Sequence, residues 1–161
     1  MITYNEVNIS WMIFWITYWI FGSMMTYYSW KKGYCKIVRL QEVVITVFIN
    51  SILGLIVSHI VVLLPIGCLS FLPIPLKYIV MMIFAEIWFY HTHILFHHPL
   101  LYKYIHKKHH DFIEPYALVS VFCTTSEFFI CNFITVVITP ILVNLTSIYL
   151  YIWVFFGTTW R

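Results

Sequence analysis

Seven of the eight histidines of this 161-residue chain fall within twenty consecutive residues, 91–110, which read HTHILFHHPLLYKYIHKKHH. His93 and His97 are four residues apart, as are His106 and His110, so each pair would share one face of a helix. Imidazole is neutral over much of the physiological pH range and binds zinc, copper, iron or nickel. A short bend between the two pairs would bring them together, and the spacing therefore predicts a metal site.

Two roles without a resident metal cofactor are also compatible with this cluster. Histidines at a membrane edge can lie among lipid headgroups, and the neighbouring Lys103, Lys107 and Lys108 can bind anionic lipid. A histidine-rich metal transporter also has imidazoles near membrane ends, but transporters distribute their ionisable ligands over several spans, whereas these histidines crowd into one segment. The density of the cluster in so apolar a chain favours a bound metal.

The number of histidines bears on which metal they bind. Zinc usually takes four ligands, often including cysteine, and none of the four cysteines lies near the cluster. More than four histidines in one segment suggest two ions, which can activate oxygen together. Iron is therefore the metal that we expect.

Four other ionisable residues are candidates for a role at this site. His91 lies two residues before His93 and points about 200° around the helix from it, and His59 stands alone in an apolar run, so we expect neither to be a ligand. Glu86 lies seven residues before His93, where it could accept the second N–H of a ligand imidazole or pair with a neighbouring helix. Glu127 falls at bilayer depth by count, which makes it a functional candidate.

The rest of the chain must place these histidines in a membrane. It is 62% hydrophobic and 9% charged, with a mean hydropathy of +0.89, and nine basic plus six acidic residues cannot cover a water-soluble core. The net charge of +3 is too small to indicate nucleic-acid binding. Composition thus predicts an all-α integral membrane helical bundle.

Apolar runs long enough to cross a bilayer of roughly 30 Å set the expected spans. They cover residues 11–28, 43–65 and 76–96, with a proline-containing connector over 65–75. Residues 116–139 and 141–157, separated by Pro140, could form two spans, a re-entrant hairpin or one kinked helix. We predict about four to five transmembrane or membrane-embedded helices and a cytosolic histidine-rich segment.

The distribution of basic residues gives the orientation. Lysine and arginine gather after the first span, in residues 30–42, and after the third, in residues 103–108. Two crossings separate these clusters, so both lie on one side of the membrane, and the positive-inside rule makes that side cytosolic.

The stretch EIWFYHTHILFHHPLLYKYIHKKHHDFIEP resembles the fatty acid hydroxylase and sterol desaturase superfamily, integral membrane di-iron monooxygenases that include methylsterol oxidases. This family has an H-x-x-x-H box, an H-x-x-H-H box and, further along, an acidic residue that would be Glu127. The resemblance implies six metal ligands, which would hold iron, with zinc as a substitute: His93, His97, His98, His106, His109 and His110. It also implies a lipid substrate, electrons from a cytochrome or reductase, and a place in the endoplasmic reticulum membrane.

Three departures from the family pattern limit what the resemblance implies. Ile94 stands where the family usually has arginine, Thr124 and Thr125 stand where it commonly has His-Pro, and the third histidine box is absent from the sequence. We therefore divide the chain into an N-terminal transmembrane region, 1–75, and a partial fatty acid hydroxylase domain with two of three boxes, 76–161.

The sequence leaves two functions open. The first is a membrane-bound di-iron monooxygenase-like protein that hydroxylates a sterol or fatty acid, present here as an incomplete copy that would not oxidise lipid by itself. The alternative is a non-catalytic truncated isoform or pseudoenzyme that keeps only the membrane scaffold.

Overall fold

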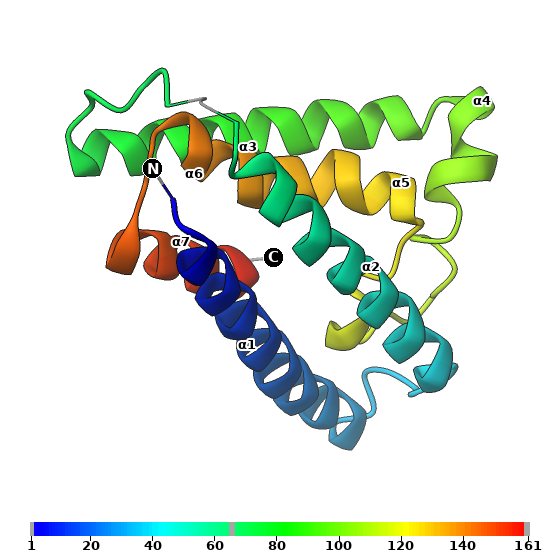
Figure 1. The fold of residues 1–161 in the computed structure, drawn as a ribbon. Coiled ribbons are helices and arrows are strands. Elements are labelled where there is room, and N and C mark those ends of the chain that lie inside the picture. The colour runs from blue at the N-terminus through cyan, green and yellow to red at the C-terminus, as the bar shows by residue number, and fades with distance from the viewer. Residues whose placement is uncertain (1, 65–66, 160–161) are drawn as a thin grey trace.

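The computed structural model describes residues 2–64 and 67–159, and within these residues all regular structure is helical. Four long helices and one shorter helix make up most of the molecule (Figure 1). They are α1 (Tyr4–Lys31), α2 (Leu40–Val61), α3 (Ile74–Phe96), a continuous helix formed by α5 (Thr125–Glu127), η3 (Phe128–Ile138) and α6 (Thr139–Leu142), and α7 (Ser147–Thr159). The continuous helix is called the α5–α6 helix below. Three short pieces complete the list: α4 (Pro99–Leu101), η1 (Tyr102–His106) and η2 (Ala117–Val119).

The four long helices are long and apolar enough to cross a membrane. Their outer faces carry large apolar side chains, such as Ile79, Ile83 and Ile87 of α3, which are 51–55% exposed and suited to contact with lipid. At 13 residues, α7 is shorter than the roughly 20 residues that a span requires, although it is apolar. The predicted all-α membrane bundle of about four to five helices is confirmed.

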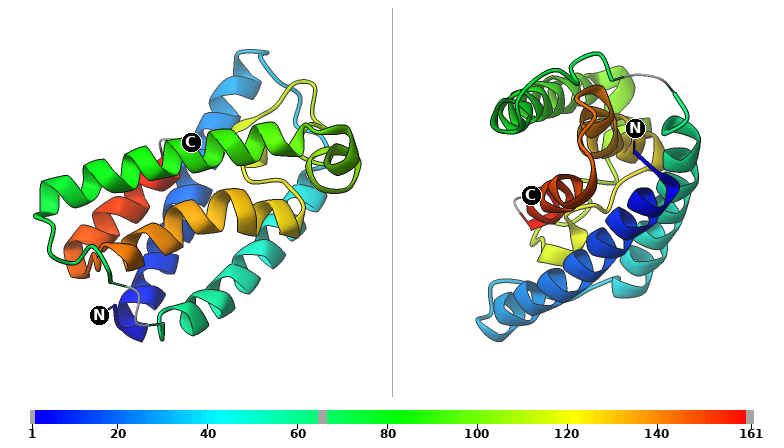
Figure 2. Two further views of the ribbon diagram at one scale, coloured as in Figure 1. Left: turned by 90° about the horizontal axis from the view of Figure 1, so that it is seen from above. Right: turned by 60° about the vertical axis from the view of Figure 1, so that its left-hand side comes forward.

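The helices pack in two groups that meet along the α5–α6 helix. This helix runs beside α3 in both views of Figure 2 and also contacts α2. On the other side, α1 packs against α7 and against α2. The α5–α6 helix therefore lies in the interior of the bundle, which accounts for the large buried share of its residues.

The start of α1 is tied to the start of α7. Thr3 and Glu6 form a capping box, in which Thr3 Oγ1 accepts from Glu6 N at 3.2 Å and Glu6 Oε2 accepts from Thr3 N at 2.7 Å. The other oxygen of Glu6, Oε1, accepts hydrogen bonds from the backbone N–H and the hydroxyl of Ser147. One carboxylate thus caps α1 and fixes the N-terminal end of α7 against it.

The boundaries of α2 and α3 differ from those predicted. α2 ends at Val61, four residues before Pro65, which lies outside the described residues. α3 begins at Ile74 and includes Pro75 in its first turn, although we expected Pro75 in the connector. A proline is accommodated there because the first N–H groups of a helix have no partner within it.

The sequence left the arrangement around Pro140 open, and in the structure the C-terminal apolar region is not divided at this residue. The region 116–124 is irregular apart from η2, the α5–α6 helix continues through Pro140 to Leu142, and the chain turns only after that. Proline cannot donate to the carbonyl four residues before it, here Val136. Trp153 of α7 donates its indole N–H to this oxygen at 3.3 Å, so a neighbouring helix replaces the lost donor.

The loop after α1 and the segment after α3 lie at the same end of the bundle. Arg39 at the start of α2 is 3.4 Å from the carboxylate of Asp111 and 2.7 Å from that of Glu42. Lys108 donates to the hydroxyl of Thr46 at 3.0 Å. These contacts agree with the predicted topology, in which the two basic clusters share one side of the membrane.

This arrangement predicts the result of cysteine labelling. Cysteines introduced as Lys36→Cys and Lys107→Cys, both at exposed positions, should react with a membrane-impermeant maleimide from the same, cytosolic side. Cys68, which is exposed in the connector at the opposite end, is the internal control and should react from the other side. Labelling of the two introduced cysteines from opposite sides would contradict the topology.

Candidate metal centre and adjoining cavity

Four histidines converge where α3 ends. His93 lies in the last turn of α3, His97 follows its last residue, His106 ends η1, and His110 lies in the turn after η1. One ring nitrogen from each lies within 4.8 Å of those of the other three. The bend after His97 brings the two boxes together, as the sequence spacing predicted.

The ring nitrogens of the four histidines lie close to one another in two pairs. His93 Nε2 and His97 Nε2 are 3.2 Å apart, and His106 Nε2 and His110 Nε2 are 2.9 Å apart. Two unprotonated imidazole nitrogens repel one another at such distances unless a proton or a cation lies between them. Four neutral imidazoles arranged in this way are a donor set suited to a transition-metal ion.

Glu127 fixes the orientation of the innermost imidazole. His106 is fully buried, and its Nδ1 lies 2.8 Å from Oε1 of the buried Glu127. In the tautomer that carries the proton on Nδ1, this N–H donates to the carboxylate and the lone pair of Nε2 points toward the other three rings. This is the usual outer arrangement of a metal-binding histidine, in which a carboxylate holds the ring and increases its basicity.

Two buried polar atoms beside this hydrogen bond have no hydrogen-bond partner among the described residues. They are Oε2 of Glu127 and Nδ1 of His109, which lies 3.9 Å from Glu127 Oε1, too far for a hydrogen bond. Buried polar groups are rarely left unpaired. The two atoms adjoin the histidine group, so they could serve as further ligands.

The histidines outside the membrane spans favour the neutral form. Burial, followed by the neighbouring imidazoles of His93 and His110, lowers the pKa of His106 to about 3. Burial also lowers the pKa of His109 and of His110, each with a further contribution from nearby histidines. These rings therefore carry no competing proton on their ligand nitrogens at neutral pH.

Thr124 connects the helix that carries Glu127 to the segment that carries His106. Its hydroxyl donates to the carbonyl of Ile105 at 2.7 Å and accepts from the backbone N–H of Glu127 at 3.3 Å. In the sequence, Thr124 was notable only as a departure from the family pattern, and nothing there pointed to this partner. The residue positions the carboxylate against the imidazole.

The other candidate residues lie outside the group of four. His98 caps α4 by accepting from Leu100 N at 3.4 Å, so its assignment as a ligand stays a prediction. The ring nitrogens of His91 and His59 bond carbonyls four residues earlier in their own helices, at 2.7 and 2.9 Å. Glu86 is exposed on α3 and has no hydrogen bond or ion pair to a described residue, so it orients no imidazole.

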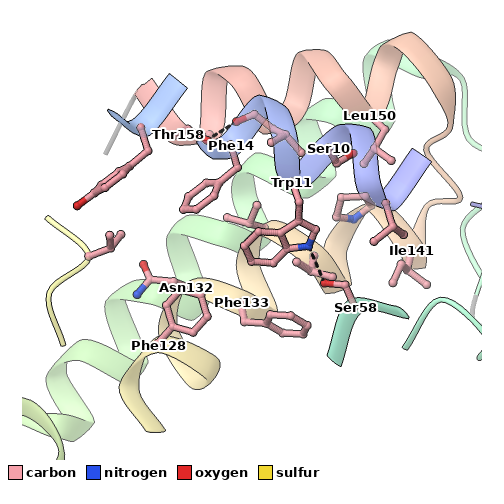
Figure 3. A pocket seen from close by; sticks show the side chains of 18 of the residues that line it. Ser10, Trp11, Phe14, Ser58, Phe128, Asn132, Phe133, Ile141, Leu150 and Thr158 are labelled. Atoms are coloured by element: carbon pink, nitrogen blue, oxygen red, sulfur yellow. Dashed lines mark hydrogen bonds between the residues drawn. The ribbon is translucent and has the colours of Figure 1, made fainter. Parts of the chain in front are cut away.

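A cavity of about 460 Å³ begins at this site. His93, His109 and Glu127 form part of its wall, and the remainder is mainly apolar side chains of α1, η3, α6 and α7, including Trp11 and Phe14 (Figure 3). The volume and apolar lining are typical of a site for a small hydrophobic molecule. Such a molecule could reach the histidines without crossing water.

Comparison with known proteins gives consistent matches over the second half of the chain. The fatty acid hydroxylase family model matches residues 78–161. Human fatty acid hydroxylase domain-containing protein 2 is 37% identical over 59 residues, which cover 37% of this chain and 18% of that protein. Fatty acid hydroxylase ahd1 of Mycosarcoma maydis is 41% identical over 69 residues, covering 43% of this chain and 17% of that protein.

A third relative, methylsterol monooxygenase 1 of Gallus gallus, is 44% identical over 36 residues, which cover 22% of this chain and 12% of that protein. The chain therefore spans less than a fifth of the length of each of these relatives. No solved structure matches it.

The geometry predicts which substitutions remove bound metal. His97→Ala and His106→Ala should each lower the iron or zinc recovered per mole of purified protein, measured by plasma mass spectrometry, because each deletes one of the four converging nitrogens. His91→Ala is the matched control, since this ring bonds its own helix. Equal metal content in all three variants would contradict the assignment of His97 and His106 as metal ligands.

A separate prediction concerns Glu127. Glu127→Gln removes the charge that orients His106 but keeps the size of the side chain. It should weaken metal affinity by about 10- to 100-fold, as is usual when such a carboxylate is lost. Competition with a chelator of known affinity measures the change, and an unchanged affinity would show that the hydrogen bond only supports packing.

Proposed function

The chain belongs to the fatty acid hydroxylase family. We propose that it forms the site of a membrane-bound oxidoreductase that inserts oxygen into a C–H bond of a lipid. The observation that carries the proposal is the position of the histidine cluster in the wall of an apolar cavity. A lipid in this cavity has its carbon atoms beside the only group of residues in the described structure that could hold a metal.

The residues fit an iron cofactor. Imidazole and carboxylate are ligands that iron accepts, and the site offers both, including the unpaired atoms of His109 and Glu127. His93, His97, His106 and His110 would hold the first ion, and His109 and His98 are the further ligands that we propose for a di-iron site. Iron bound here supplies the one-electron and oxygen chemistry that side chains lack.

The residues of the chain position the lipid, orient the ligand imidazoles and exclude water from the site. The apolar wall binds the hydrocarbon and excludes water, which would otherwise compete for the reacting centre. Glu127 holds the proton at Nδ1 of His106 and so keeps its Nε2 available as a ligand. Thr124 holds the segment that carries His106 against the start of the α5–α6 helix, which carries Glu127.

The reaction also needs two electrons and two protons per oxygen molecule, with water as the second product. We propose that a cytochrome or reductase delivers the electrons on the cytosolic side, where His97 and His110 are exposed at the membrane edge. The membrane that we propose is that of the endoplasmic reticulum.

A product assay tests the proposed function. Membranes that contain the protein, an electron donor, oxygen and a mixed sterol and fatty-acid extract are assayed by mass spectrometry for lipids heavier by one oxygen atom. We expect none from these 161 residues alone, because they do not contain the third histidine box that the family resemblance implies. If product forms, the variant His106→Ala, which loses the Nε2 ligand atom, should reduce it to the level of membranes without the protein.

The assay should include a second arm, because the family resemblance implies a third histidine box that these 161 residues do not contain. In this arm the chain is joined to a relative's segment that carries the box. Product in this arm alone would show that the site requires further ligands. Product in neither arm would contradict the proposed oxidation and favour a non-catalytic role.

A further inference from the structure

The cavity wall contains a few polar side chains among its apolar ones. Ser58 donates to the carbonyl of Gly54 at 2.8 Å and accepts from the indole of Trp11 at 3.1 Å, and Thr158 donates to the carbonyl of Val154 at 2.7 Å. The hydrogen-bonding capacity of Ser58 and Thr158 is therefore used within the protein, and these two residues add little preference for a polar ligand. Ser10 of α1 also lines the cavity, and its Oγ is buried without a hydrogen-bond partner among the described residues.

Asn132 also has an unpaired side chain, and unlike Ser10 it belongs to η3, the helix that Glu127 directly precedes. Its side chain lines the cavity, is only partly buried and has no hydrogen bond to any residue in the described part of the chain. Figure 3 shows the carboxamide next to Phe128. The carboxamide carries two N–H donors and one acceptor oxygen, all of which remain available to an occupant of the cavity.

The π-helical geometry of η3 places Asn132 close to the histidine site. In a π-helix the hydrogen bonds join residues five apart, so residues i and i+5 lie one turn apart on the same face. Glu127 directly precedes η3 and Asn132 is five residues after it. The carboxamide therefore lies about one turn from the carboxylate that orients His106.

An unpaired amide in an apolar wall becomes costly when a bound molecule excludes water from it. Transfer of such a group from water without a compensating hydrogen bond is unfavourable by about 1–3 kcal/mol in proteins. A hydrocarbon chain in the cavity imposes this cost, whereas a hydroxyl or carbonyl oxygen next to the amide removes it. The wall thus distinguishes oxygenated lipids from plain hydrocarbons.

We propose that Asn132 is a specificity-determining residue, which hydrogen-bonds a hydroxyl or carbonyl oxygen of the lipid and so selects substrates that already carry oxygen near the carbon to be oxidised. This inference rests on the proposed function only in assuming that a lipid occupies the cavity. It assigns to Asn132 a contact with the substrate and leaves the metal to the histidines.

Binding without turnover tests the role of Asn132. Two pairs of tritiated lipids differ by one hydroxyl group: cholesterol with 5-cholestene, and hexadecan-1-ol with hexadecane. The wild-type protein in detergent should bind the hydroxylated member of at least one pair about tenfold more tightly. The pair that shows the preference distinguishes a sterol from a chain-like ligand.

Three variants complete the experiment. Asn132→Leu, of similar size, should lose the preference and keep the affinity for the hydrocarbon, and Asn132→Ala is the second variant should the leucine not fit. Val136→Ala is the matched control, since it reshapes the same wall without removing a polar group, and it should change both members of a pair alike.

The outcomes separate the two proposals. An equal preference in wild type and Asn132→Leu, or none in wild type, overturns the role of Asn132 even if the cavity binds lipid. Failure of all four lipids to bind overturns the lipid cavity and with it this inference. Product formation in the oxidation assay tests the metal site and does not depend on the preference at Asn132.

Discussion

The buried hydrogen bond between His106 and Glu127 joins the segment after α3 to the start of the interior α5–α6 helix. His106 follows α3 through a tight bend, whereas Glu127 lies in the first turn of the α5–α6 helix, and both side chains are almost completely buried. A charged or polar group at this depth needs a partner. The bond satisfies Nδ1 of His106 and one oxygen of Glu127, directs one ligand nitrogen toward the other three and places the cavity wall next to them.

The sequence predicted the parts of this structure that depend on local pattern. Lipid requires long apolar runs, so the spans followed from composition, and the four-residue spacing of His93 and His97 followed from helix geometry. The sequence left open whether the chain is divided at Pro140, because the helix continues there with the help of another helix, whose Trp153 indole supplies a donor to the carbonyl of Val136. No local pattern could indicate a partner that tertiary packing supplies, and the same holds for Glu127 and His106.

Several polar side chains inside the spans form hydrogen bonds within their own helices. Thr92, Thr135 and Thr139 donate to carbonyl oxygens three or four residues earlier in their own helices. Each hydroxyl is satisfied without a partner helix, so these residues do not mark functional sites. Asn132 lacks such an arrangement, whereas Glu127 and Thr125 of the same helix obtain partners outside it, Glu127 from His106 and Thr125 from Asn50 of α2.

The contact of Glu6 with Ser147 has a consequence for biogenesis. The two residues are 141 positions apart, and the ribosome delivers α1 to the membrane before α7. Until α7 has been synthesised, Oε1 of Glu6 must be solvated at the membrane surface, and the wall that α1 and α7 build around the cavity stays open. Closure of this long loop therefore follows the insertion of α1, α2, α3 and the α5–α6 helix, and the pocket exists only after α7 has packed against α1.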